Sequence, residues 1–132
     1  MSEKVYDLEE RTYLFAREVR AFVKKLEKTI TNVDDIRQLG RSSGSVAANY
    51  IEVNENLGAK DLLMKVRTCK REAKESVLWL KLLDVQKENE KTRQKLLTEA
   101  TELKNILGSI YQNRLKSTEI KSIGKFPAPE KN

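Results

Sequence analysis

The chain has 132 residues, of which 39% are hydrophobic and 35% are charged, and its formal net charge is +6. The length is that of a single domain, and glycine (5) and proline (2) are too scarce for the many turns of an all-β fold. Histidine is absent and Cys69 is the only cysteine, which excludes an intramolecular disulfide, a thiolate metal cluster and a histidine general base.

The first predicted helix follows a short leader, residues 1–6. Asp7 and Glu10 have the spacing of a capping box, which marks the start of a helix. Apolar residues then recur every three or four positions, at Leu8, Phe15, Val19, Phe22, Val23 and Leu26. The polar segment 29–35 ends this pattern, and Thr31 or Asn32 is the predicted N-cap of the second helix.

The second predicted helix contains a segment of small side chains, runs to about Asn56 and is expected to stop at Gly58. The segment Arg41 to Glu52 is charged only at its two ends, and its small side chains allow two helix backbones to approach closely. On a helix that turns about 100° per residue, four polar residues of this segment share one face. They are Arg41, Ser45, Asn49 and Glu52. We expect this face to form a close contact, either within the chain or between subunits.

Two further helices are predicted after Gly58. The third extends from about Lys60 to Gln86, and residues 87–90 form a polar break before the fourth, at about residues 91–116. From Ser117 the periodicity is lost and two prolines follow among polar residues, which predicts a flexible basic tail over residues 117–132. The economical fold for residues 7–116 is an all-α, antiparallel, up-down four-helix bundle.

Catalysis is the function that these residues support least. Cys69 lies on the apolar stripe of the third helix, where a thiol packs as a small hydrophobe. The serines of the Arg41–Glu52 segment lie on a predicted helix and not on the strained turn that exposes a nucleophilic serine. Glu72 and Glu75 have a spacing found in metal-binding bundles, but those sites also use histidine. We therefore predict no enzyme activity, no metal, no cofactor and no small-molecule substrate.

Positive charge is concentrated in the third helix. Residues 59–87 contain eight basic and four acidic residues, whereas residues 31–58 have a net charge of −2. Six cations of this helix fall within about 100° of its circumference and form what we call the cationic stripe. They are Lys60, Arg67, Lys70, Arg71, Lys74 and Lys81. A stripe of one sign and this length suits a phosphate backbone, and the alternative is an ordinary solvated face.

Apolar residues also lie on the third helix away from its core stripe. They are Met64, Leu78, Trp79 and Leu82. An apolar patch that cannot face the bundle's own core is typical of a subunit interface. We therefore expect a closed homo-oligomer, and the alternative is a third helix that is buried on all sides.

The order of residues around the small-residue segment resembles a family signature. The pattern consists of Arg41, Ser42, Ser43, Ser45, Val46, Asn49 and Glu52, with further matches at Glu75, Leu80 and residues 106–110. It resembles the four-helix bundle proteins encoded in intervening sequences of bacterial 23S ribosomal RNA genes, over about residues 8–116. The resemblance implies a left-handed up-down bundle that assembles into a homopentamer. Ala47 and Val53 stand where that family often has proline and glycine, so a proline kink is not expected here.

Two functions are consistent with these patterns. In the first, the cationic stripe binds nucleic acid, with structured RNA or an RNA–protein complex as the expected ligand. In the second, the chain is an assembly or accessory protein whose surface binds a protein partner such as a reverse transcriptase, because bundles related to this family serve as accessory subunits of such enzymes. The N-terminus is too polar for a signal peptide, and no apolar run approaches the ~20 residues of a membrane helix, so we expect a cytoplasmic protein.

Overall fold

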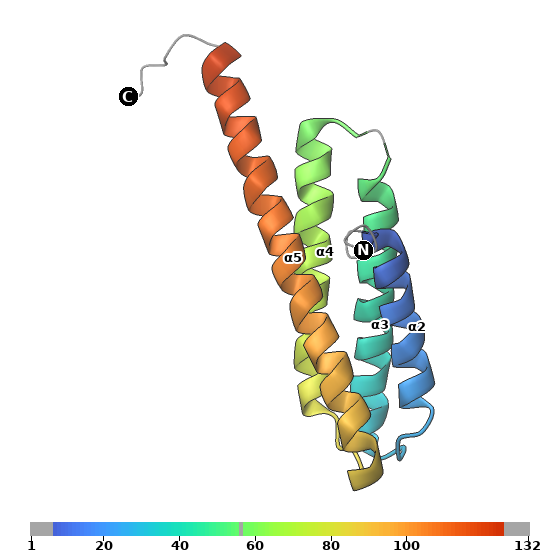
Figure 1. Ribbon diagram of the computed structural model, residues 1–132. Helices are drawn as coiled ribbons and strands as arrows, with labels where there is room; N and C mark the ends of the chain where they lie inside the picture. The colour runs from blue at the N-terminus through green and yellow to red at the C-terminus, as the bar shows by residue number, and fades with distance from the viewer. Residues whose placement is uncertain (1–6, 56, 126–132) are drawn as a thin grey trace.

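The computed structural model describes residues 7–55 and 57–125, and of residues 118–125 it describes the backbone alone. These residues form four α-helices: α2 (Leu8–Val23), α3 (Ile30–Val53), α4 (Ala59–Leu82) and α5 (Lys87–Lys125). Consecutive helices run antiparallel and pack against one another as a four-helix bundle (Figure 1), which confirms the predicted fold class. α5 is the longest helix, and its C-terminal part extends beyond the ends of the other three (Figure 1).

Two side-chain caps determine where α2 and α3 begin. Asp7 caps α2, and its Oδ1 accepts a hydrogen bond from the Glu10 backbone N–H at 3.1 Å, as predicted from the sequence. α3 is capped by Thr29, whose Oγ1 accepts a hydrogen bond from the Asn32 backbone N–H at 3.2 Å. The prediction of Thr31 or Asn32 as this cap is therefore wrong. Asn32 lies inside the first turn of α3, and its buried side chain bonds to the connecting loops instead.

The segments that join α3, α4 and α5 also differ from the predicted ones. α3 ends at Val53, and Gly58 is the N-cap of α4, with φ −67° and ψ 164°, rather than the stop of α3. The predicted end of the helix at Asn56 falls outside the described residues. The second break lies at residues 83–86, and the predicted polar break at 87–90 is the first turn of α5. Glu88 and Glu90 favour a helix start there, because the N-terminal end of a helix carries partial positive charge.

The predicted boundary between bundle and tail is wrong for the backbone. α5 continues past Ser117 to Lys125, although the apolar periodicity stops near Leu115. Backbone hydrogen bonds form within the helix itself, so a helix can continue beyond the end of its apolar face, as α5 does. Residues 1–6, the predicted leader, and residues 126–132 of the predicted tail lie outside the described part of the chain.

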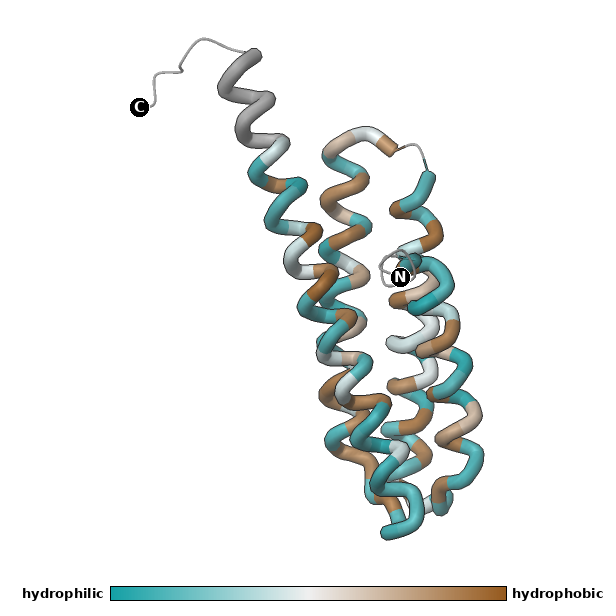
Figure 2. Tube along the Cα trace, in the orientation of Figure 1, coloured by the Kyte–Doolittle hydropathy of each residue, from teal (hydrophilic) through white to brown (hydrophobic). Residues whose placement is uncertain are grey.

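The hydrophobic core lies along the facing sides of the four helices, where apolar positions alternate with polar ones along each tube (Figure 2). Its largest fully buried apolar side chains are Phe15, Val19, Phe22, Leu39, Val46, Val66, Leu80, Leu103 and Leu107. Each helix supplies at least two of them, so the core depends on all four. None of the described helices has both the length and the apolar character needed to cross a bilayer.

Buried and partly buried polar side chains tie the two loops at one end of the bundle together. Asn32 Nδ2 donates to the carbonyl oxygens of Glu27 and Asp84, each at 2.9 Å, and Asn32 Oδ1 accepts from the Asp84 backbone N–H at 2.9 Å. Arg93 of α5 donates to three carbonyl oxygens at the C-terminal end of α4, at 2.6 to 3.3 Å. The α2–α3 loop is therefore held against the α4–α5 loop by directional bonds, in addition to apolar packing.

Candidate functional site

The charged ends of the Arg41–Glu52 segment are joined to α4 of the same chain. A guanidinium nitrogen of Arg41 lies 3.3 Å from a carboxylate oxygen of Glu72 and another lies 2.8 Å from one of Glu75. Glu52 pairs with Lys65 of α4. Only 9% of the Glu72 side chain is exposed, so Arg41 supplies the positive charge that this carboxylate needs in a poorly hydrated position. These contacts are intramolecular and help to hold α3 beside α4.

The other two residues of the predicted polar face bond to each other. Asn49 Nδ2 donates to the Ser45 carbonyl oxygen at 2.9 Å and to the Ser45 hydroxyl oxygen at 3.0 Å. Both residues are half-buried. They therefore make a contact within α3, and the close approach expected of them lies elsewhere.

The close approach of α3 to α4 lies on a neighbouring face of the same segment. Ser42 Oγ and Ser76 Oγ are 2.7 Å apart, and both residues are fully buried. The Cys69 thiol, also fully buried, lies 3.7 Å from the Val46 carbonyl oxygen. Burial raises the pKa of the Cys69 thiol from 9.0 to about 12, so the thiol is protonated near neutral pH. A protonated, buried thiol is a packing residue and a poor nucleophile.

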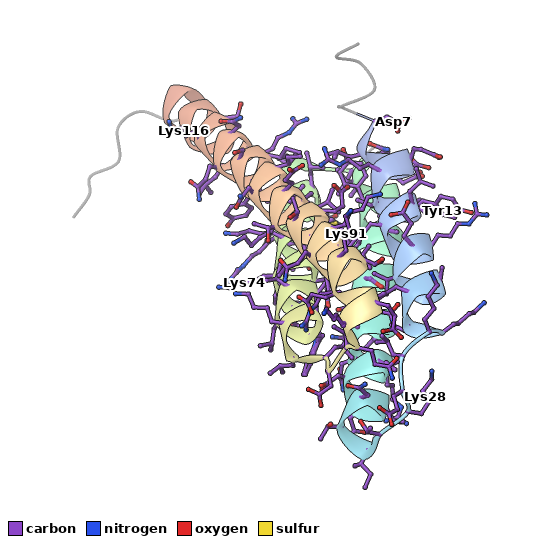
Figure 3. All side chains as sticks on the ribbon, turned by 60° about the horizontal axis from the view of Figure 1, so that its bottom comes forward. Asp7, Tyr13, Lys28, Lys74, Lys91 and Lys116 are labelled. Atoms are coloured by element: carbon purple, nitrogen blue, oxygen red, sulfur yellow. The ribbon has the colours of Figure 1, made fainter. Side chains whose placement is uncertain are left out.

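The cationic stripe lies on the outer side of α4 and is largely unneutralised. Lys70 is half-buried and the other five cations are exposed. Arg71 approaches a carboxylate oxygen of Glu72 only to 3.9 Å, and none of the other five has an ion-pair partner within the described part of the chain. Lys74 projects outward from α4, on the side of the bundle opposite to Tyr13 of α2 (Figure 3).

A groove between α4 and α5 brings part of the cationic stripe together with a further lysine. The groove has a volume of about 710 Å³ and is lined by Lys70, Lys74, Lys104, Asn105, Gly108, Ser109, Gln112 and Asn113. Sequence reasoning missed the α5 residues of this set. The available signal was that polar side chains at 104, 105, 109 and 112 share one side of a helix whose other side carries Leu103 and Leu107.

The predicted apolar patch is present in part. Met64, Leu78 and Leu82 are exposed, with 59%, 47% and 52% of their surface accessible. Trp79 does not belong with them: it is half-buried and packs against the core, so its assignment to the outer patch is wrong. The Trp79 Nε1 is buried without a hydrogen-bond partner in the structure.

The described residues contain no group of three or more cysteine, aspartate and glutamate side chains placed to hold a metal ion. Glu72 and Glu75, the pair noted in the sequence, share Arg41 as their partner. No family model, curated protein or solved structure matches the chain.

Proposed function

We propose that this chain is a cytoplasmic, non-enzymatic, homo-oligomeric bundle that binds nucleic acid, as structured RNA or an RNA–protein complex, through the cationic stripe. The observation that supports this most is the lack of ion-pair partners for five of the six cations in the described part of the chain. Most surface charges elsewhere on α3 and α4 are paired, as with Arg41 and Lys65. Unpaired cations on one helix face create a positive potential, and binding phosphates there releases counterions.

Assembly strengthens this proposal, because a ring of subunits repeats the stripe. A single stripe neutralises only a few phosphates. When several stripes of one ring bind the same nucleic acid, binding of the first stripe raises the effective concentration at which the next stripe meets the nucleic acid, and the overall affinity increases. Met64, Leu78 and Leu82 lie exposed on the outer side of α4 and provide an apolar surface for a neighbouring subunit. Lys70, Lys74 and Lys81 are rotated from this surface toward α5, so a subunit that covers the apolar residues leaves this part of the stripe accessible. The family resemblance suggests five subunits.

The oligomer is tested by static light scattering at micromolar concentration. We expect a mass several times the 15.2 kDa of the chain. Leu78→Lys should lower that mass, because a charge at an apolar interface loses burial and leaves an unpaired cation. Ile30→Lys, which changes an equally apolar and 84% exposed residue at the start of α3, is the matched control and should assemble as the wild type does. A monomeric wild-type protein would contradict the proposed assembly.

Nucleic-acid binding is tested by filter-binding titration of a structured RNA at two salt concentrations. The wild type should bind at low salt and weaken steeply as salt increases, because each neutralised phosphate contributes about 0.7 to 0.9 to the slope of log K against log salt. The double reversal Arg67→Glu with Arg71→Glu should weaken binding by about tenfold or more and leave the helical circular dichroism unchanged, because both side chains are exposed.

A matched control uses two exposed cations on the other side of the bundle. Arg17→Glu with Lys24→Glu, both on or next to α2, changes the net charge by the same amount. If this control weakens binding as much as the α4 reversal, binding depends on total charge and not on the stripe. If the wild type binds no RNA at low salt, the second function is favoured, in which the exposed apolar residues of α4 contact a protein partner such as a reverse transcriptase.

A further inference from the structure

The groove between α4 and α5 differs from the cationic stripe because it is a concave site built from two helices. Lys70 and Lys74 enter it from α4 and Lys104 from α5. None of these three lysines has an ion-pair partner within the described part of the chain, and the described lining of the groove includes no carboxylate. By contrast, the 450 Å³ groove between α2 and α5 has charged residues of both signs in its lining, Arg11 and Lys95 together with Glu18 and Glu99. The α4–α5 groove therefore concentrates positive charge that the protein itself does not neutralise.

The remaining lining residues are hydrogen-bonding groups of moderate size. Asn105, Gln112 and Asn113 offer amide donors and acceptors, and Ser109 offers a hydroxyl. Gly108 lines the groove without a side chain. A Cβ atom at this position would lie 3.6 Å from Lys70 Cε, in contact with the lysine side chain. No aromatic side chain is part of the described lining, so the groove has no surface on which an unpaired base would stack.

We propose that this groove holds the sugar–phosphate backbone of a nucleic-acid duplex, with Lys70, Lys74 and Lys104 contacting successive phosphates of one strand. The inference rests on the proposed function and adds the face of α5 to it. Lys70 and Lys74 are one helical turn apart, about 6 Å along α4, which is close to the distance between neighbouring phosphates on a strand. Lys104 faces them across the groove from the antiparallel α5. A duplex is favoured over a single strand because its bases are already stacked and only its backbone needs to be held.

The test compares fluorescence anisotropy of a labelled RNA duplex, a DNA duplex of the same sequence, and one isolated RNA strand at low salt. Lys104→Glu should weaken duplex binding about tenfold, because it removes a phosphate contact and places a carboxylate in the groove. Lys91→Glu is the matched control: it lies on the same helix with the same charge change, exposed and about 140° around the helix axis from Lys104. The control should bind within about twofold of the wild type. Figure 3 labels Lys91 on α5 and Lys74 on α4.

A second variant tests the shape of the groove without changing charge. Gly108→Leu places a branched side chain against Lys70 and should weaken duplex binding, whereas binding that depends on net charge alone would be unaffected. Circular dichroism checks that each variant is folded. Comparison of the two duplexes identifies whether the sugar 2′-hydroxyl contributes, because a preference for RNA requires a contact to that group.

The outcomes separate this inference from the proposed function. If the wild type binds none of the three nucleic acids, both the proposed function and the groove inference are wrong. If the wild type binds but Lys104→Glu and Lys91→Glu behave alike, the proposed function stands and the groove inference is overturned. If the single strand binds as tightly as the duplex, the assignment of a duplex backbone is overturned.

Discussion

Replacing Asn32 with aspartate should lower the free energy of unfolding by about 3 kcal/mol. The side chain is 1% exposed and makes three hydrogen bonds of 2.9 Å to two loops. An aspartate keeps the acceptor for the Asp84 N–H but loses both donors. Its carboxylate would then face the carbonyl oxygens of Glu27 and Asp84, which are acceptors as well. Burying a charge against two acceptors costs more than losing the bonds alone.

The measurement is urea unfolding followed by circular dichroism. Asn54→Asp is the matched control, because Asn54 makes one exposed hydrogen bond, to Glu9 at 2.7 Å, and its replacement should cost less than about 1 kcal/mol. Asn32→Ala should fall between them, at about 2 kcal/mol, since it removes the bonds without adding a charge. Equal stabilities for Asn32→Asp and Asn54→Asp would show that the two loops are not held together through Asn32.

The fold was predictable because its signals are local. The Asp7 cap and the apolar spacing of three and four residues are properties of single helices, and both are present in the structure. The N-cap of α3 was not predictable in the same way. Thr29, Thr31 and Asn32 are all good capping residues by type, and the choice depends on Asp84, which is distant in sequence and bonds to Asn32.

The candidate site was predictable only on α4, the helix that carries the cationic stripe. The cationic stripe follows from the period of α4 alone, and its residues lie where that period places them. Lys104 was missed because the rotation and axial register of α5 against α4 depend on core packing between the two helices. Trp79 was misplaced for a related reason, since a side chain near the edge of a core stripe turns inward or outward according to the neighbouring helix.

The small-residue segment illustrates the same limit within one helix. The sequence correctly indicated a segment that permits close approach, but the face chosen for the contact was that of Arg41 and Ser45. In the structure Ser42 is fully buried against Ser76, whereas Ser45 is half-buried and bonds to Asn49. Because neighbouring positions on a helix differ by about 100°, an error of a few positions moves the contact to another face. The substitution that tests close packing is therefore at Ser42.

Ser42→Leu should lower the free energy of unfolding by roughly 3 kcal/mol, because the larger side chain has no space where the two serine oxygens are 2.7 Å apart. Ser42→Ala should cost about 1 kcal/mol or less, since Ser76 keeps its hydrogen bond to the Glu72 carbonyl oxygen at 3.0 Å. Ser45→Leu is the matched control at a half-buried position of the same helix and should also cost less than about 1 kcal/mol. Thermal and urea unfolding of the three variants give these differences directly. If Ser42→Leu were as stable as Ser45→Leu, α3 and α4 would have to separate readily at this point, and Ser42 would not be the position that sets their spacing.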